Sequence, residues 1–155
     1  MTSENWKKVI EAIGFLTLIV SMILVAYEVR QNTKIVEAQT RDAMTDKQMS
    51  FYDSIIDNPD NADIWITGLW SYSDLEERTP SRSRFEWIVR KQFRMWENEW
   101  YQYQQGLFSE LEFEPRIALW AEVMNFSEGH RATWEILRSV HTADFAEQID
   151  AILEN

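Results

Sequence analysis

The sequence predicts an all-α fold, in which an N-terminal transmembrane helix continues into a stalk and is followed by a compact bundle of four to five shorter helices. An apolar run lies near the amino end, apolar side chains recur at helical spacing elsewhere, and no segment alternates with period two between hairpin turns. The chain has 155 residues, 45% of them hydrophobic, which suffices for one folded domain beside that run. We expect residues 1–28 to form a membrane anchor, 29–57 a helical stalk and 58–155 a helical domain.

The apolar run has the length and the flanks of a membrane-spanning helix. Residues 12–27 contain no charged side chain, and adding Val9 and Ile10 extends the run to about nineteen residues with Glu11 as its only charge. The aromatic and basic side chains typical of membrane interfaces flank it: Trp6, Lys7, Lys8 and Tyr27. A buried helix of a soluble core and a cleavable signal peptide are the alternatives, although Leu24-Val25-Ala26 is a poor cleavage site.

One stripe of this helix predicts association with another helix. Gly14, Thr17, Ser21 and Leu24 recur at spacings of 3, 4 and 3 residues, which places them on one face. Helices in lipid pack where small side chains let their backbones approach. We therefore expect contact with a copy of this chain or with another membrane subunit; the alternative is that the stripe binds nothing.

The basic residues on either side of the run predict its orientation. Two lysines precede it, whereas four basic residues follow it within about twenty positions. These four are Arg30, Lys34, Arg41 and Lys47. This asymmetry favours a C-terminal domain in the cytoplasm.

The remaining chain reads as a series of helices. The stalk should end at Asn58-Pro59, and its far end, which carries Phe51 and Ile55, should pack on the domain. Helices are then expected over residues 62–70, from Pro80 to about Gln105, from Pro115 to a break at Asn125–Gly129, up to Val140, and after a cap at Thr142. A capping box is expected at Ser83 and Glu86. The strongest signal is a stripe at spacings of 3 and 4, formed by Phe85, Val89, Phe93, Trp96, Trp100, Tyr103 and Leu107.

Charge is segregated along the chain and allows two interpretations. Residues 78–94 hold six basic side chains and one acid, Glu86, whereas 53–77 hold seven acids and no base. The basic segment is either a patch for anionic lipid headgroups or a partner, or it pairs with the acidic segments beside it. The whole chain has 15 Lys and Arg against 26 Asp and Glu, a formal net charge of -11, so we expect no nucleic-acid partner.

The residues that could carry chemistry are few, and we expect no enzymatic activity, cofactor or metal. The sequence contains no cysteine, which excludes disulfides, zinc ribbons and thiol catalysis. A helical di-metal site needs Glu-x-x-His on two helices; Glu128 is one residue too close to His130, and no acid stands three residues before His141. His130 is expected in a polar turn and His141 at a helix C-terminus. Eight Trp and eight Phe at helical spacing favour a core over a pigment or quinone site.

Three short runs carry a resemblance to a known family. They are Val29–Lys34 (VRQNTK), Trp96–Leu107 (WENEWYQYQQGL) and Phe145–Ile152 (FAEQIDAI). Together they resemble a bacterial family of small single-pass membrane proteins with an N-terminal membrane helix, an RQNT-type stalk and a helical domain, for which no activity is established. The resemblance implies the bacterial cytoplasmic (inner) membrane. It also implies roles for Gln31, Asn32, Glu97, Asn98, Tyr101, Tyr103 and Gly106.

Two functions are compatible with these features. The first is a non-enzymatic structural or accessory subunit of a membrane protein assembly, built from copies of itself or from other subunits. The alternative is a membrane-tethered regulator or binding module that captures a soluble partner or small ligand, which predicts a concave pocket inside the bundle and an exposed apolar patch. Of the implied residues, Glu97 is expected to pair with Arg94 or Lys91, while Asn98 and Tyr101 share a face apart from the aromatic stripe. These polar residues either contact a partner or form a buried network that fixes helix packing.

Overall fold

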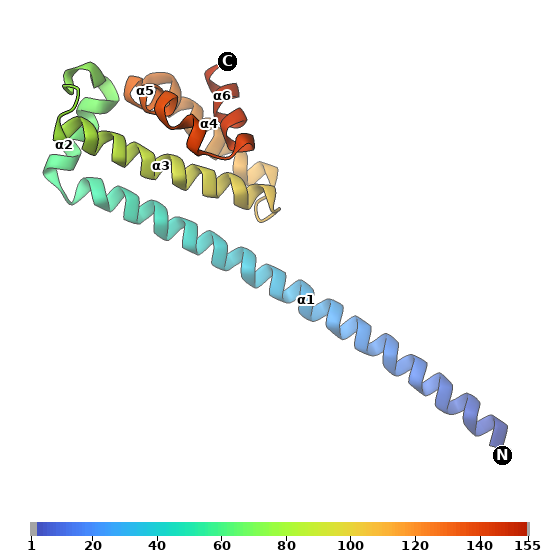
Figure 1. Cartoon of the computed structure of the whole chain (residues 1–155). Helices are drawn as coiled ribbons and strands as arrows, with labels where there is room; N and C mark the ends of the chain where they lie inside the picture. Colours follow the sequence, from blue (N-terminus) through green and yellow to red (C-terminus); the bar gives the residue numbers. More distant parts are fainter. Residues whose placement is uncertain (1–2, 155) are drawn as a thin grey trace. The chain divides into compact units, whose positions relative to one another are not determined.

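A computed structural model describes residues 3–154, and these residues form six α-helices, two short 3-10 turns and no strand (Figure 1). The all-α prediction is confirmed for this part of the chain. The helices are α1 (Ser3–Ile56), α2 (Pro59–Trp70), α3 (Pro80–Gln104), α4 (Glu110–Phe126), α5 (Glu128–Leu137) and α6 (Ala143–Leu153). The 3-10 turns are η1 (Tyr72–Asp74) and η2 (Arg138–Val140).

The chain divides into two compact units within α1, at Arg41 and Asp42. We call residues 3–41 the N-terminal unit and residues 42–154 the C-terminal unit. The N-terminal unit is helical, and its large apolar side chains are exposed, from 38% at Ile19 to 67% at Tyr27. α1 is long and apolar enough to cross a membrane, and within the described residues none of its most apolar 18-residue window is buried.

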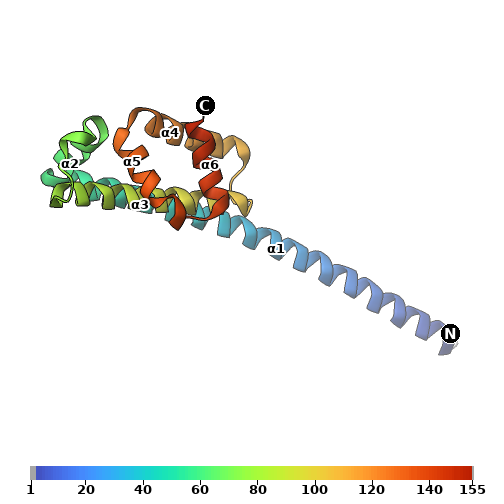
Figure 2. The same cartoon turned by 45° about the horizontal axis from the view of Figure 1, so that its top comes forward.

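The C-terminal unit begins with an antiparallel pair formed by residues 42–56 of α1 and by α3. The side chain of Gln48 bonds Glu99, whereas Phe51 and Ile55 pack with Ile88, so numbers rise along one helix as they fall along the other. Figures 1 and 2 show the two helices side by side in both views. The predicted packing at Phe51 and Ile55 is confirmed, and burial extends back to Met44, which is 3% exposed.

The aromatic stripe of α3 forms the centre of the main core, as predicted. Phe85, Val89 and Phe93 are fully buried and Trp96 is 2% exposed. Trp100 and Tyr103 of the stripe are half-buried against the same core, as is Leu107, which lies beyond the end of α3. The Trp96 ring stacks on Trp120 of α4 with centroids 5.4 Å apart. Burial of such large rings contributes much of the hydrophobic free energy available to a unit of this size.

Two helices start earlier than the sequence predicts, because the residues that cap them lie further upstream than expected. α2 starts at Pro59. The side chain of Asn58 caps it by accepting hydrogen bonds from the backbone N–H groups of Asp60 and Asn61. α4 starts at Glu110 and not at Pro115: Ser109 and Glu112 form a capping box, and Pro115 lies inside the helix. Pro115 removes one backbone hydrogen bond there without ending α4.

Two other local expectations were wrong. The first turn of α3 is capped by Thr79, whose hydroxyl accepts from the Arg82 N–H, and not by a box at Ser83. Glu86 instead accepts hydrogen bonds from the Tyr72 hydroxyl and the Arg82 side chain. Finally, the break expected at Asn125–Gly129 is Ser127 alone.

Gly129 serves close packing rather than helix breaking. A Cβ atom there would overlap the carbonyl oxygen of Gly68 and the Phe85 ring, and one at Gly68 would overlap the same ring. α2 and α5 therefore approach each other over Phe85 at a distance that only glycine permits.

Candidate functional site

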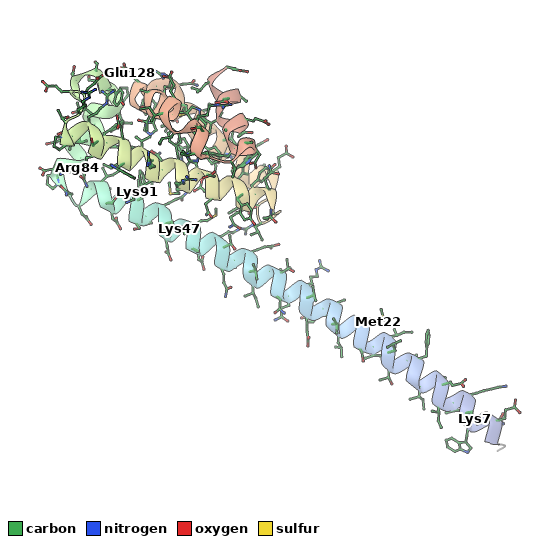
Figure 3. All side chains as sticks on the ribbon, in the orientation of Figure 1. Lys7, Met22, Lys47, Arg84, Lys91 and Glu128 are labelled. Carbon is green, nitrogen blue, oxygen red and sulfur yellow. The ribbon has the colours of Figure 1, made fainter. Side chains whose placement is uncertain are left out.

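An open groove of about 670 Å³ lies between residues 46–51 of α1 and residues 87–98 of α3. Its lining residues are Asp46, Lys47, Ser50, Phe51, Trp87, Arg90, Lys91, Arg94, Met95 and Asn98. The volume is within the roughly 300–1,000 Å³ range of ligand sites. We call this feature the α1–α3 groove; Figure 3 labels Lys47 and Lys91 on the two helices that form it.

The groove combines free cations with apolar side chains. Within the described residues, Lys47, Arg90 and Lys91 form no ion pair, and Asp46 is the one acid in the lining. Phe51 is 5% exposed, whereas Trp87 is 60% exposed with the Arg90 guanidinium 4.4 Å above its ring. In a chain of net charge -11, this concave surface is positively charged.

Part of the basic segment 78–94 is paired within the structure. Arg82 pairs with Glu86, stacks on Tyr72 at 3.5 Å and donates to the carbonyl oxygens of Tyr72 and Leu75. Arg84 lies 3.9 Å from Asp60. Pairing thus accounts for these two residues, while Arg90 and Lys91 face the groove.

At the edge of the groove, Glu97 joins Arg94 to the start of α6. Its Oε2 accepts from Arg94 at 2.6 Å and from His141 Nδ1 at 3.0 Å, and its Oε1 accepts from the Thr142 N–H at 2.7 Å. Burial alone would raise the pKa of Glu97, but these three hydrogen bonds outweigh it and lower that pKa. The predicted Glu97–Arg94 pair is confirmed.

His141 is the C-cap residue of η2, the 3-10 helix that directly follows α5, so it stands at a helix C-terminus as expected, and its side chain is fully buried. The rings of Trp134 and Phe145 lie 5.4 and 5.3 Å from it. Burial lowers its pKa, and the hydrogen bond to Glu97 only partly opposes this. The imidazole is therefore neutral near pH 7 and donates from Nδ1 to Glu97.

Glu99 lies in a second polar cluster, which joins three helices. Its carboxylate is 2% exposed, accepts from Gln48 of α1 at 2.6 Å and pairs with Arg116 of α4 at 3.2 Å. Burial raises its pKa above the ordinary value, although Arg116 and Gln48 act in the opposite direction. This cluster, with a neighbouring pocket of about 320 Å³, was missed by sequence reasoning. The available signal was the position of Glu99, three residues after Trp96 on the buried stripe.

The expectation of a polar turn at His130 was wrong. This side chain is fully buried in α5. Its Nδ1 lies 2.8 Å from the Ser127 hydroxyl, and its Nε2 lies 2.8 Å from the side-chain amide oxygen of Gln92. Because that oxygen can only accept, Nε2 carries the proton and Nδ1 accepts from Ser127. Burial lowers the pKa of His130 to about 3. Ser127 is equally buried and caps α5, so its hydroxyl is no exposed nucleophile. The hydrogen bond between His130 and Gln92 joins α5 to α3.

The other residues implied by the resemblance are dispersed. Asn98 lines the groove, but Tyr101 is 57% exposed outside its lining, and Tyr103 stacks on Phe113 at 4.3 Å. Gly106 adopts a φ of 74° just after α3, a conformation that favours glycine at a helix end. Gln31 and Asn32 are exposed on α1.

The hydroxyl groups of the small-residue stripe form their hydrogen bonds within α1. The hydroxyl of Thr17 donates to the Ile13 carbonyl and that of Ser21 to the Thr17 carbonyl, each at 2.8 Å. A Cβ at Gly14 would meet no atom of the described residues within 4 Å, and Leu24 is 57% exposed. Lys7 and Lys8 are exposed as well.

The residues from 3 to 154 contain no group of three or more acidic and histidine side chains placed to hold a metal ion. Comparisons with protein-family models, curated proteins and solved structures gave no match.

Proposed function

We propose that this chain is a non-enzymatic single-pass membrane protein that serves as an accessory subunit of a membrane assembly. The observation that carries the proposal is the exposed apolar part of α1. A soluble protein would bury about nineteen apolar residues, because exposing them to water costs about 25 cal/mol per Å² of apolar surface. Lipid supplies the missing contact, with Trp6 and Tyr27 at the two interfaces.

Insertion and orientation can be tested with single cysteines, because the sequence contains none. Glu4→Cys and Ser73→Cys mark the two sides of the proposed span. We expect both variants to stay in carbonate-washed bacterial inner membranes. In intact spheroplasts, an impermeant maleimide should label Glu4→Cys and not Ser73→Cys. Extraction by carbonate would contradict insertion, and the reverse labelling would contradict a cytoplasmic C-terminal unit.

Assembly can be tested at the small-residue stripe. The triple variant Gly14→Leu, Thr17→Leu and Ser21→Leu fills the face where a second helix would approach. We expect it to lose the cross-linked species that migrate above the monomer in native gels. The matched control is Phe15→Leu, Ile19→Leu and Met22→Leu on the opposite side of the helix, which should leave those species intact. Equal behaviour of the two variants would contradict association through this stripe.

The α1–α3 groove favours a second candidate, a membrane-tethered binding module. Its volume, free cations and exposed Trp87 suit a ligand or partner better than a purely structural surface. A photoreactive amino acid at Asn98, which lines the groove, should form an adduct in native membranes. The same group at Tyr101, which does not line it, is the control. Equal labelling at both positions, or at neither, would contradict this candidate.

A further inference from the structure

The α1–α3 groove has the form that a third helix fills in a helical bundle. On α3 the lining side chains recur at spacings of 3 and 4 residues, and on α1 Lys47, Ser50 and Phe51 do the same. Trp87 and Asn98 stand eleven residues apart, about 16 Å along the helix axis at roughly 1.5 Å per residue. Three turns of a docked helix match that length.

The charges of the groove define the sign of its occupant. Lys47 stands on the α1 wall, and Arg90 and Lys91 stand on the α3 wall, so cations line both sides. Arg94 is held in place by Glu97, whose carboxylate also offsets its charge, and by the Val140 carbonyl oxygen. Three free cations against Asp46 favour carboxylates along the flanks of whatever binds.

Between these walls the groove is apolar. Phe51 and Met95 lie between the two helices, and the exposed Trp87 ring stands at one end of the α3 row. A phosphate-type headgroup is held best where cations converge on one point, whereas here they are spread over two walls with apolar side chains between them. A ligand with an apolar stripe flanked by acids covers both features.

We propose that the α1–α3 groove docks an acidic amphipathic helix of a partner protein. The inference rests on the binding-module function proposed above and names the chemistry of its partner. Apolar side chains of the partner at spacings of 3, 4 and 3 residues cover Trp87, Met95 and Phe51. Its flanking Glu and Asp side chains pair with Lys47, Arg90 and Lys91.

The test uses the full chain in nanodiscs of neutral lipid and a fluorescein-labelled synthetic peptide of about fourteen residues. The peptide carries Leu at helical spacing with Glu on both flanks, and its control carries Lys in place of Glu. We expect saturable binding of the Glu peptide by fluorescence anisotropy and at least about tenfold weaker binding of the Lys peptide. Raising NaCl from about 0.05 to 0.5 M should weaken binding of the Glu peptide.

Charge reversal in the groove provides the matched variants. Lys91→Glu should weaken binding of the Glu peptide by about threefold, and the triple Lys47→Glu, Arg90→Glu and Lys91→Glu by at least about tenfold. Lys34→Glu makes the same change at an exposed lysine outside the groove and should bind like the unmodified chain. All three side chains of the triple lie at the surface or half-buried, so the far-UV spectrum and melting curve should be retained.

Four results would overturn the inference. They are equal binding of the Glu and Lys peptides, absence of saturable binding, loss of Glu-peptide binding in nanodiscs that contain anionic lipid, and self-association that Lys91→Glu abolishes. The third would assign the groove to lipid headgroups and the fourth to a second copy. An Asn98 adduct that persists while the Glu peptide does not bind would overturn this inference and leave the binding-module function standing.

Discussion

The two units of the molecule treat apolar side chains in opposite ways. In the N-terminal unit, large apolar residues such as Phe15 and Ile23 are more than half exposed. In the C-terminal unit, the rings of Phe85, Phe93 and Trp96 on α3 are buried, and the acid Glu99 and the imidazole of His130 are buried with them. The large apolar side chains of the first unit are thus exposed within the described residues, whereas the second unit buries most of its large rings in a core.

The largest expected difference between the two units is that acid lowers the stability of the C-terminal unit. Because the pKa of folded His130 is lowered from 6.5 to about 3, the unfolded chain binds more protons between these values. The stabilisation is complete above pH 6.5 and is lost as the pH falls toward 3, by at most on the order of 5 kcal/mol. The lowered pKa of Glu97 adds a loss below pH 4.5. The raised pKa of Glu99 acts in reverse, since its contribution is lost as the pH rises above 4.5.

Urea titrations in detergent, followed by tryptophan fluorescence, measure this slope. Every tryptophan except Trp6 lies in the C-terminal unit, so the signal reports that unit. We expect His130→Gln to flatten the dependence between about pH 6.5 and 4. Identical slopes for the two proteins would contradict a neutral, buried His130.

A matched pair of phenylalanines tests the contrast in burial. Phe93 is fully buried and Phe15 is 65% exposed. We expect Phe93→Ala to reduce the free energy of unfolding by about 3–5 kcal/mol and Phe15→Ala to change it by less than about 0.5 kcal/mol. Urea denaturation of the two variants in the same detergent checks this. A comparable loss in both would mean that Phe15 is covered by the chain itself.

A matched pair of glycines tests the same contrast between the two units at the backbone. Gly129→Ala places a methyl group against the Gly68 carbonyl and the Phe85 ring, whereas Gly14→Ala meets no described atom within 4 Å. We expect Gly129→Ala to cost about 1–3 kcal/mol, because α2 and α5 must separate. Gly14→Ala should be neutral or slightly stabilising, by about 0.5–1 kcal/mol, in a helix interior. Thermal melts give both values, and an unaffected Gly129→Ala would contradict the close approach.

The smallest expected effect separates structural cations from exposed ones. Arg82→Ala removes the pair with Glu86, two carbonyl contacts and the stack on Tyr72, and we expect a loss of about 1–2 kcal/mol. Arg84→Ala removes an exposed pair with Asp60 at 3.9 Å, which should cost less than about 0.5 kcal/mol. Urea denaturation at about 0.15 M salt measures the difference. Equal losses would show that Arg84 is also structural.

Periodicity and helix-breaking residues predicted much of this fold from the sequence. The α3 stripe from Phe85 to Trp96 and the break at Asn58-Pro59 are local patterns, and both are confirmed. Pro115 was misread because the capping box at Ser109 already starts α4, and one missing N–H does not end it.

The groups at the candidate site could not be predicted in the same way. Gln48, Glu99 and Arg116 lie on three helices, and their contact depends on the antiparallel packing of α1 on α3. The α1–α3 groove depends on the same packing. Sequence spacing placed Asn98 away from the aromatic stripe, yet it gave no indication that Lys47 would line the opposite wall.

The stacked indoles of Trp96 and Trp120, inclined by 18°, make the junction of α3 and α4 optically distinct. Two such chromophores in contact couple their electronic transitions, which produces a paired band in circular dichroism that a lone indole lacks. We expect the contribution of this pair to disappear when either ring is replaced by phenylalanine or when the two helices separate. This pair should therefore serve as a label-free reporter of whether the C-terminal unit is folded.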